Sequence, residues 1–313
     1  MRPAQWTKNL FVLVALPFSG QWSAVDGLSS LGTCAAFCLL SSCVYLINDL
    51  ADRASDRLHP TKRFRPIASG ELSVGLAIAA ALVLLLASAA IIALIGYWLI
   101  HTANQSFVLE RDEIPGYVAA RLLAFWSASY FMLNLAYSLR LKQYAIMDVL
   151  IIATCFVLRA MAGAAAIAVI ISPWLVVCTF TLCLFIALAK RRSEIAMLGD
   201  AAQSTRRANG FYTLVNIEHM LAVSAGLAIV TYTLYCLAQR TIARHSANLV
   251  WTIPLVIYGM FRYYCLALSA DSQDVAKLLS RDKVMWLVVF LWMLAVVVVI
   301  RWGGSPLFKG ILQ

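Results

Sequence analysis

The sequence predicts an all-α integral membrane protein, a bundle of about nine transmembrane helices that forms one domain over residues 1–313. The chain is 62% hydrophobic and 13% charged, with a mean hydropathy of +0.82, whereas soluble proteins average roughly 45–50% apolar residues. Apolar stretches of about 20 residues, the length that crosses a bilayer as a helix, recur along the chain. These unbroken runs exclude the alternating strands of a β-barrel, and no linker rich in Gly, Ser or Pro divides them.

Nine segments are predicted to span the membrane as helices, because in lipid a helix satisfies its own backbone hydrogen bonds. The first follows the basic start MRPAQWTKN and leads straight into further apolar segments, which predicts a span rather than a cleavable signal peptide. In order, the segments cover residues 10–26, 30–50, 72–100, 118–138, 146–171, 173–190, 212–238, 248–268 and 284–301.

Lysine and arginine are unevenly divided between the two faces of the membrane. One set of loops, around residues 2–8, 53–65, 140–142, 190–207 and 277–283, is clearly richer in positive charge. The positive-inside rule makes this face cytoplasmic, with the N-terminus inside and, after nine spans, the C-terminus outside. The net charge of +10 then reflects topology and anionic substrates or lipid head groups rather than nucleic acid.

Two other features carry no predicted chemistry. The eight cysteines all lie in apolar segments, without a CxxC pair or the Cys/His spacing of a zinc site, and are predicted to be packing residues. The polar segment 101–117 falls on the opposite face and is predicted to be a surface loop.

The strongest functional signal is the sequence NDLADRASD, which follows the apolar run ending at Ile47 in the second predicted span. Asn48, Asp52 and Asp56 are spaced by four residues, so a helix that continues past the membrane carries all three on one face. Such oxygen side chains repel one another unless a cation lies among them, and they suit Mg²⁺, which binds one or two carboxylates together with substrate phosphates. A solvated cytoplasmic turn is the alternative.

A basic loop with two prolines, HPTKRFRPIASG, follows this motif. Its lysine and arginines, Lys62, Arg63 and Arg65, can bind phosphate oxygens while the acids hold a metal, and together they predict a metal–diphosphate site. The alternative is that these bases serve membrane topology alone.

A second polar group ends the fourth predicted span and opens the fifth. Tyr137, Lys142 and Asp148 could bring a hydroxyl, an ammonium and a carboxylate to the same cavity. Arg159 follows Asp148 by about three helical turns. An arginine so deep is costly in lipid, which predicts that it lines a polar cavity, with a structural ion pair as the alternative.

A third basic group, KRRSE, closes the sixth predicted span. Lys190 and Arg191 could bind a lipid phosphate or could only anchor the span at the membrane surface.

These motifs resemble the UbiA superfamily of membrane prenyltransferases, which uses NDxxDxxxD to hold Mg²⁺ and a diphosphate. The resemblance covers essentially the whole chain. Ordinary members carry a second motif, DxxxD, after the fourth span, where this chain reads YSLRLKQYAIMD with the single Asp148. That departure, together with RPAQWTKN, HPTKRFRPIASG and KRRSE, resembles the decaprenyl-phosphate phosphoribosyltransferase branch, whose diphosphate donor is phosphoribosyl diphosphate (PRPP).

The resemblance implies a role for each matching residue. The expected ligands of Mg²⁺ and the diphosphate are Asn48, Asp49, Asp52 and Asp56. The expected PRPP contacts are Lys8, Asn48, Lys62, Arg65, Tyr137 and Lys142, and the expected catalytic residues are Asp52, Asp56 and Asp148. The weaker candidates for the lipid phosphate are Arg159, Lys190 and Arg191.

The resemblance implies a bacterial inner-membrane enzyme that transfers 5-phosphoribose from PRPP to a polyprenyl (decaprenyl) phosphate, a step of cell wall biosynthesis in organisms that build arabinan. A lysine in place of a second acid cluster would favour the extra 5-phosphate of PRPP. The first alternative is a UbiA prenyltransferase acting on an aromatic or other small acceptor, which the missing DxxxD disfavours. The second is an ion-coupled transporter, whose site would lie near the midplane of the membrane. The sequence leaves open whether the protein forms a homo-oligomer through apolar helix faces.

Overall fold

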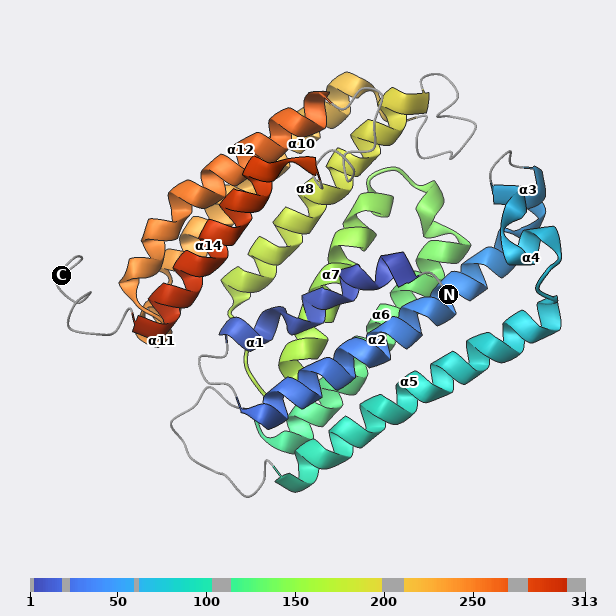
Figure 1. Cartoon of the computed structure of the whole chain (residues 1–313), viewed down its shortest axis with the longest axis horizontal. Coiled ribbons are helices and arrows are strands. Elements are labelled where there is room, and N and C mark those ends of the chain that lie inside the picture. Colours follow the sequence, from blue (N-terminus) through green and yellow to red (C-terminus); the bar gives the residue numbers. More distant parts are fainter. Residues whose placement is uncertain are drawn as a thin grey trace. The chain divides into compact units, whose positions relative to one another are not determined.

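The structure is a computed structural model that describes residues 3–18, 23–58, 62–102, 114–198, 211–269 and 281–302 (Figure 1). Within these ranges the regular elements are helices and no β-strand is present. The predicted all-α class is confirmed.

Eight helices in the described ranges are long and apolar enough to cross a membrane. They correspond to the second to ninth predicted spans, so the chain is a multi-span membrane protein. These helices are α2 (Ala24–Ala51), α5 (Val74–Thr102), α6 (Gly116–Leu139), α7 (Met147–Ala166), α8 (Pro173–Leu198), α10 (Leu214–Leu237), α12 (Ile253–Ser269) with the preceding η7 (Ala247–Thr252), and α14 (Lys283–Trp302).

The first predicted span, residues 10–26, is not one continuous helix, and its predicted boundaries are wrong. The chain instead forms the 3₁₀-helix η1 (Pro3–Val14) and a single α-turn, α1 (Ala15–Phe18). Ser23 then starts α2 with a capping box, because its hydroxyl accepts from the Asp26 N–H while the Asp26 carboxylate accepts from the Ser23 N–H. At about 2.0 Å per residue, η1 alone reaches about 24 Å, most of the roughly 30 Å hydrocarbon core.

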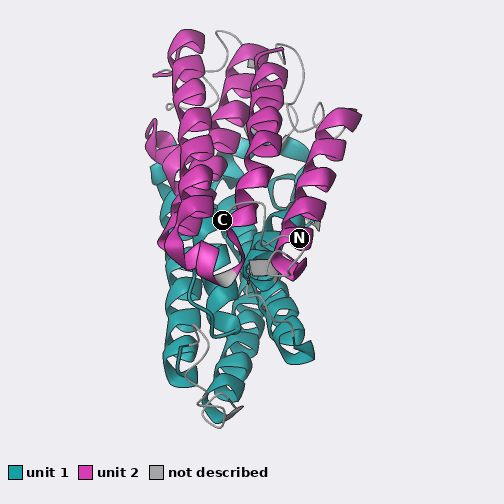
Figure 2. Ribbon diagram, turned by 90° about the vertical axis from the view of Figure 1, so that its left-hand side faces the viewer, with its two compact units in different colours: residues 1–142, 155–171 teal, residues 143–154, 172–313 magenta. Residues whose placement is uncertain are grey.

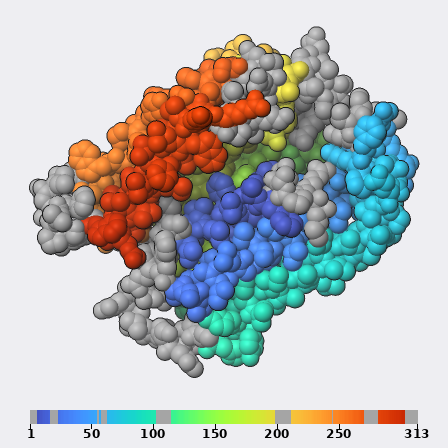
Figure 3. Space-filling view, viewed as in Figure 1, coloured from blue at the N-terminus to red at the C-terminus, as the bar shows by residue number. Residues whose placement is uncertain are grey.

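The chain divides into two compact units (Figure 2). Unit 1 holds residues 1–142 and 155–171, and unit 2 holds residues 143–154 and 172–313. In unit 1, α2 packs against α5 and α6, and η1 lies along α2 (Figure 3). In unit 2, α8 pairs with α10, and α12 packs against α10 and α14.

One close backbone approach fixes η1 in unit 1. A Cβ atom added to Gly163 of α7 would lie 1.8 Å from the carbonyl oxygen of Val12. Only glycine lets the backbones of η1 and α7 come this near, in the way that small residues bring membrane helices together.

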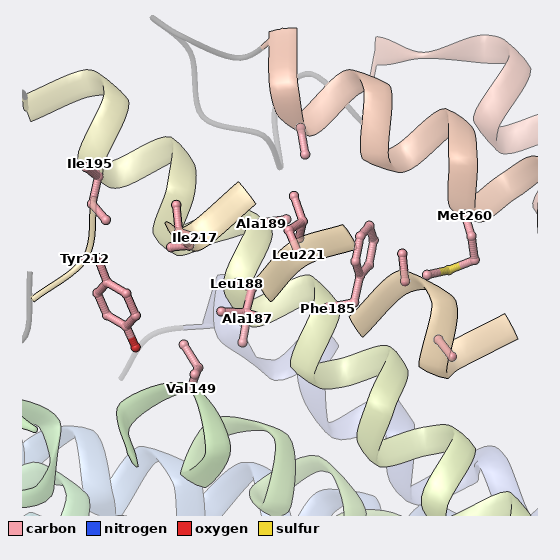
Figure 4. Packing of buried hydrophobic residues seen from close by; sticks show 13 residues of the cluster. Val149, Phe185, Ala187, Leu188, Ala189, Ile195, Tyr212, Ile217, Leu221 and Met260 are labelled. Carbon is pink, nitrogen blue, oxygen red and sulfur yellow. The ribbon is translucent and has the colours of Figure 1, made fainter. Parts of the chain in front are cut away.

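The core of unit 2 is built where α8, α10 and α12 meet (Figure 4). The ring of Phe185 packs edge-on against Tyr263, with centroids 5.0 Å apart. This packing fixes the end of α8, which carries three consecutive basic residues. The labelled members of the cluster are Val149, Phe185, Ala187, Leu188, Ala189, Ile195, Tyr212, Ile217, Leu221 and Met260.

Candidate active site

The NDLADRASD motif lies where α2 ends and a short helix, α3 (Arg53–Leu58), begins. Asp52 caps α2, and its N–H donates to the Asn48 carbonyl at 2.9 Å, while the Asp56 N–H donates to the Asp52 carbonyl at 2.8 Å. Helical four-residue hydrogen bonds therefore pass through the bend. They preserve the predicted spacing of Asn48, Asp52 and Asp56 along successive turns.

The basic loop folds back onto this motif. It forms η2 (Lys62–Phe64) and α4 (Pro66–Ser69), which lie beside α3 at the end of α2 (Figure 1). The Arg57 Nε donates to the Ala68 carbonyl at 3.0 Å and so joins α3 to α4. Arg65, which precedes α4, places its Nη1 2.7 Å from Asp56 Oδ2 and 3.2 Å from Asp49 Oδ1. The structure thus brings Arg65 of the basic loop next to two acids of the motif, while its predicted contact with phosphate stays a prediction.

Lys142 reaches the same motif from the short η4 (Leu141–Gln143) that follows α6. Its Nζ donates to both carboxylate oxygens of Asp52, at 2.7 and 2.8 Å, and to Asn48 Oδ1 at 3.2 Å. The structure thus joins two polar groups that lie about 90 residues apart in the chain. We call the six residues the acid–base cluster: Asn48, Asp49, Asp52, Asp56, Arg65 and Lys142.

The acid–base cluster contains three carboxylates and two cations, which leaves one net negative charge. Its members are partly withdrawn from water, because Asp56 is 3% exposed and the side chain of Lys142 is 16% exposed. In the described part of the chain, no three His, Cys, Asp or Glu side chains gather as a metal site does. Each carboxylate instead faces a base.

The donor chemistry of the acid–base cluster nevertheless fits Mg²⁺. This ion needs only one or two protein carboxylates, and takes its other ligands from water and phosphate. The Lys142 ammonium already stands as a cation among three oxygens of Asn48 and Asp52. The oxygens that would hold a metal are therefore close enough to share a positive charge.

The remaining predicted PRPP contacts are only partly described. Lys8 lies on η1 and Tyr137 on the last turns of α6, and both are half-buried members of unit 1. The side chain of Lys62 lies outside the described residues, so its predicted role stays a prediction.

Unit 2 contains a network of polar side chains around Asp148, in the first turn of α7. Asp148 is fully buried and pairs with Arg191, whose guanidinium also binds Glu194. The Tyr212 hydroxyl donates to Asp148 Oδ1 at 2.9 Å and accepts from the Ile146 N–H at 2.6 Å. Ile146 has a left-handed φ of 67°, an unfavourable conformation for a β-branched residue. The Tyr212 hydroxyl therefore holds this strained turn next to Asp148.

Tyr212 is a residue that the sequence did not single out. Burial raises the pKa of its hydroxyl, and the nearby Asp148 carboxylate raises it further, partly opposed by the Ile146 N–H and Arg191. The hydroxyl is consequently a neutral donor near pH 7. No local pattern marks it, because 64 residues separate it from Asp148.

The other two basic residues at the end of α8 differ sharply in their surroundings. Arg192 is buried and donates to Glu218 on α10 at 2.9 Å and to the Ala267 carbonyl on α12 at 3.1 Å. Lys190 is exposed, and its side chain has no hydrogen-bond or ion-pair partner among the described residues. Of the candidates for a lipid phosphate, Lys190 is thus the accessible one, whereas Arg191 is held by Asp148 and Glu194.

Arg159 is buried in unit 1, with 5% exposure. It donates to Asn9 Oδ1 at 2.9 Å, to the Tyr130 hydroxyl at 2.7 Å and to the Cys155 carbonyl at 3.2 Å. Its guanidinium also lies 4.6 Å from the centre of the Tyr130 ring. Among the described residues no carboxylate pairs with Arg159, so the ion pair considered as the alternative is not formed there, and its contacts favour a structural role.

Comparisons with known proteins agree with this architecture. Residues 10–294 match the model of the UbiA prenyltransferase family. The chain is 30% identical to a decaprenyl-phosphate phosphoribosyltransferase of Mycolicibacterium smegmatis, covering 93% of this chain and 88% of that protein. It is 29% identical to the protein of the same name from Mycobacterium tuberculosis, covering 97% and 93%.

Solved structures share the fold at low sequence identity. A UbiA homologue from Archaeoglobus fulgidus, described as bound to DMAPP and Mg²⁺, superposes with a TM-score of 0.67 at 18% identity, covering 96% of this chain and 97% of that one. The family match spans nearly the whole chain and includes every residue of the acid–base cluster. The chain therefore belongs to the UbiA prenyltransferase family, a family of membrane transferases.

Proposed function

We propose that the chain transfers 5-phosphoribose from PRPP to a polyprenyl phosphate, giving polyprenylphosphoryl-5-phosphoribose and diphosphate. The observation that carries the proposal is Lys142, which bonds to Asn48 and Asp52 and lies in the segment where ordinary family members have a second acid motif. A cation there suits a donor with an additional phosphate. The names of the relatives from Mycolicibacterium and Mycobacterium support the same substrate pair.

In the proposed reaction, a phosphate oxygen of the lipid forms a bond to C1 of the ribose. The bond between C1 and the diphosphate oxygen breaks, and the diphosphate leaves with the electron pair. The attacking lipid phosphate is already an anion, so no base is required. Mg²⁺, held by Asn48, Asp49, Asp52 and Asp56, would neutralise charge on the diphosphate.

The bases of the acid–base cluster would hold the donor. The Arg65 guanidinium and the Lys142 ammonium can each donate to phosphate oxygens, with stronger hydrogen bonds than neutral donors make. Lys8, Lys62 and Tyr137 would contact the phosphates or the ribose. Their donors would stabilise the charge that develops on the leaving group.

The carboxylates have a second proposed role. Asp56 would steady the positive charge that develops on the sugar ring as the bond to C1 breaks. Asp148 would act by holding Arg191 in place beside Lys190, which is exposed and would meet the lipid phosphate. This face of the membrane would be cytoplasmic, where the water-soluble PRPP is available.

The test uses radiolabelled PRPP and membranes that contain the full chain. With decaprenyl phosphate and Mg²⁺, label should move into a lipid-extractable, acid-labile product, and chelation with EDTA should abolish the transfer. The Lys142→Met variant should lose most of the transfer. Arg63→Met should keep it, because Arg63 belongs to the basic loop but is exposed and lies over the Phe64 ring instead of on a carboxylate of the acid–base cluster.

The family and the likeness to the Archaeoglobus structure keep a prenyl transfer as the competing function. The same membranes should be incubated with a labelled prenyl diphosphate and a small aromatic acceptor. Prenyl transfer without phosphoribosyl transfer would overturn the proposal in favour of an ordinary UbiA prenyltransferase.

A further inference from the structure

Two positive side chains occupy the acid–base cluster at the places where a metal would be held. The Lys142 Nζ lies within 2.7–3.2 Å of three oxygens from Asn48 and Asp52. The Arg65 Nη1 bridges Asp49 and Asp56 at 3.2 and 2.7 Å. Every carboxylate of the motif therefore has a protein cation beside it, and a metal that arrives must compete with that cation.

We propose that Lys142 and Arg65 are internal counter-ions that keep Mg²⁺ from binding alone, so that metal and diphosphate enter the cluster together. The inference rests on the proposed function only in taking a diphosphate as the ligand. It assigns the two bases a role before the reaction, in deciding which species binds.

The charge balance explains why metal alone would bind weakly. With the two bases in place, one net negative charge attracts a dication far less than three free carboxylates would. To coordinate Asp52, Mg²⁺ must also shed water, which it does reluctantly. It would then leave the Lys142 ammonium without a counter-charge, although its side chain is only 16% exposed, and an uncompensated, partly buried charge is costly.

A diphosphate removes this cost, because it supplies new acceptors for both bases. When Lys142 and Arg65 turn from the carboxylates to phosphate oxygens, the carboxylate oxygens become available to the metal. Each ligand then favours the other, and thermodynamic linkage makes the effect reciprocal. Couplings of this kind typically amount to about 5–150-fold in affinity.

The competing explanation is that the ion pairs only stabilise the fold. Under that explanation, removing a base would lower thermal stability and would leave metal binding unchanged or weaker. In the exchange that we propose, Lys142 and Arg65 leave the carboxylates for the diphosphate, and the metal takes their place. Removing a base then exposes a carboxylate, so metal alone should bind more tightly while diphosphate binds less tightly. The two explanations predict opposite changes in metal affinity.

The experiment measures the binding of Mn²⁺, as a paramagnetic substitute for Mg²⁺, to the purified full-length protein. The spectrum of free Mn²⁺ in electron paramagnetic resonance reports how much metal is bound when no diphosphate is present. Lys142→Met and Arg65→Met should each bind Mn²⁺ at least about fivefold more tightly than the wild type, at the lower end of typical couplings. Arg63→Met, which removes one positive charge from the loop that carries Arg65, should bind it as the wild type does.

A second measurement follows radiolabelled pyrophosphate with and without Mg²⁺. Wild type should gain pyrophosphate affinity when Mg²⁺ is added, and both cluster variants should lose most of that gain. Mn²⁺ affinity that is unchanged or lower in both variants would overturn the inference. If one variant fails to fold, the other still decides, because the two bases contact different carboxylates.

The exchange of bases for metal and the proposed phosphoribosyl transfer can be refuted independently. Wild-type phosphoribosyl transfer with unchanged Mn²⁺ affinity in the variants would refute the exchange alone. Tighter Mn²⁺ binding in a protein that transfers only prenyl groups would refute the PRPP assignment and keep the exchange, because both donors carry a diphosphate.

Discussion

At the scale of single residues, the acid–base cluster shows how much depends on one carboxylate. Asp52 caps α2, accepts two hydrogen bonds from Lys142 and shares that ammonium with Asn48. Asp52 thus combines a backbone role at the bend with a charge role in the cluster. Its substitution is therefore the most direct test of the motif.

We expect Asp52→Asn to lower phosphoribosyl transfer by about 10²-fold or more, the usual cost of removing one electrostatic group from an active site. Asparagine keeps the size of the side chain and removes its charge, so Lys142 loses its counter-ion. The measurement is the initial rate at saturating Mg²⁺. Asp26→Asn, at the exposed start of the same helix, is the control, and full Mg²⁺-dependent activity in Asp52→Asn would refute the metal assignment.

Tyr212 gives a second prediction at this scale. Tyr212→Phe removes the partner of the buried Asp148 Oδ1 and of the Ile146 N–H. A buried polar group left without a partner costs about 1–3 kcal/mol, so the melting temperature at pH 8 should fall. Tyr144→Phe, at a tyrosine with an exposed side chain, should change it little.

The difference in stability between the wild type and Tyr212→Phe should also depend on pH. Because the pKa of Tyr212 is raised in the folded state, its contribution to stability is complete below the ordinary tyrosine pKa near 10. That contribution is lost as pH rises above 10, where the unfolded chain releases the proton more readily. The stability advantage of wild type over Tyr212→Phe should therefore shrink between pH 9 and pH 11, and an advantage that grows would contradict this assignment.

At the scale of elements, the order of the helices could be predicted and their contacts could not. Eight of the nine predicted spans appear as helices, because apolar length is a property of the local sequence. The 3₁₀ geometry of η1 and the start of α2 at Ser23 were missed, since the apolar pattern alone does not distinguish a 3₁₀-helix from an α-helix. The capping sequence at Ser23 and Asp26 was the local signal that could have corrected the boundary.

The approach of η1 to α7 leads to a prediction about Gly163. Alanine normally favours a helix over glycine by about 1 kcal/mol, yet a Cβ at Gly163 would lie 1.8 Å from the Val12 carbonyl oxygen. Gly163→Ala should therefore lower the melting temperature of the detergent-solubilised protein strongly. Gly75→Ala in α5, where a Cβ meets nothing within 4 Å, should leave it equal or slightly higher. Equal stability of both variants would mean that η1 does not lie against α7.

Substitution of Arg159 tests whether this one side chain holds η1, α6 and α7 together. Its donors reach Asn9 on η1, Tyr130 on α6 and a carbonyl of α7. Arg159→Lys keeps the charge, but one ammonium cannot reproduce the planar fork of a guanidinium, so the melting temperature should fall while the KM for lipid phosphate at low temperature stays unchanged. A raised KM at unchanged stability would instead make Arg159 a lipid contact.

At the scale of the whole molecule, the sequence predicted the class, the family and half of the candidate site. NDLADRASD and the loop after it are local patterns, so the meeting of Asp49 and Asp56 with Arg65 followed from a short stretch of chain. The pairing of Asp148 with Arg191, and its bond to Tyr212, joins three distant segments. Such pairings depend on how helices pack, and local sequence patterns do not specify which distant residues come into contact.

The orientation in the membrane is the property that the distribution of charge predicts most directly. Helix α5 begins just after the acid–base cluster and runs for 29 residues, which is about 43 Å at 1.5 Å per residue and more than the roughly 30 Å hydrocarbon core. The two ends of α5 must therefore emerge on opposite faces. Glu71, just before α5, and His101, near its end, are both exposed.

Single cysteines at these two positions report the orientation. In a background where the native cysteines are replaced by alanine, including the exposed Cys265, a membrane-impermeant maleimide should label His101→Cys from outside intact spheroplasts. It should label Glu71→Cys only in inverted vesicles, because the positive-inside rule predicts that the basic loops beside Glu71 stay in the cytoplasm. The reverse pattern would place the acid–base cluster outside the cell, where no PRPP is made, and would remove the phosphoribosyl transfer together with the orientation.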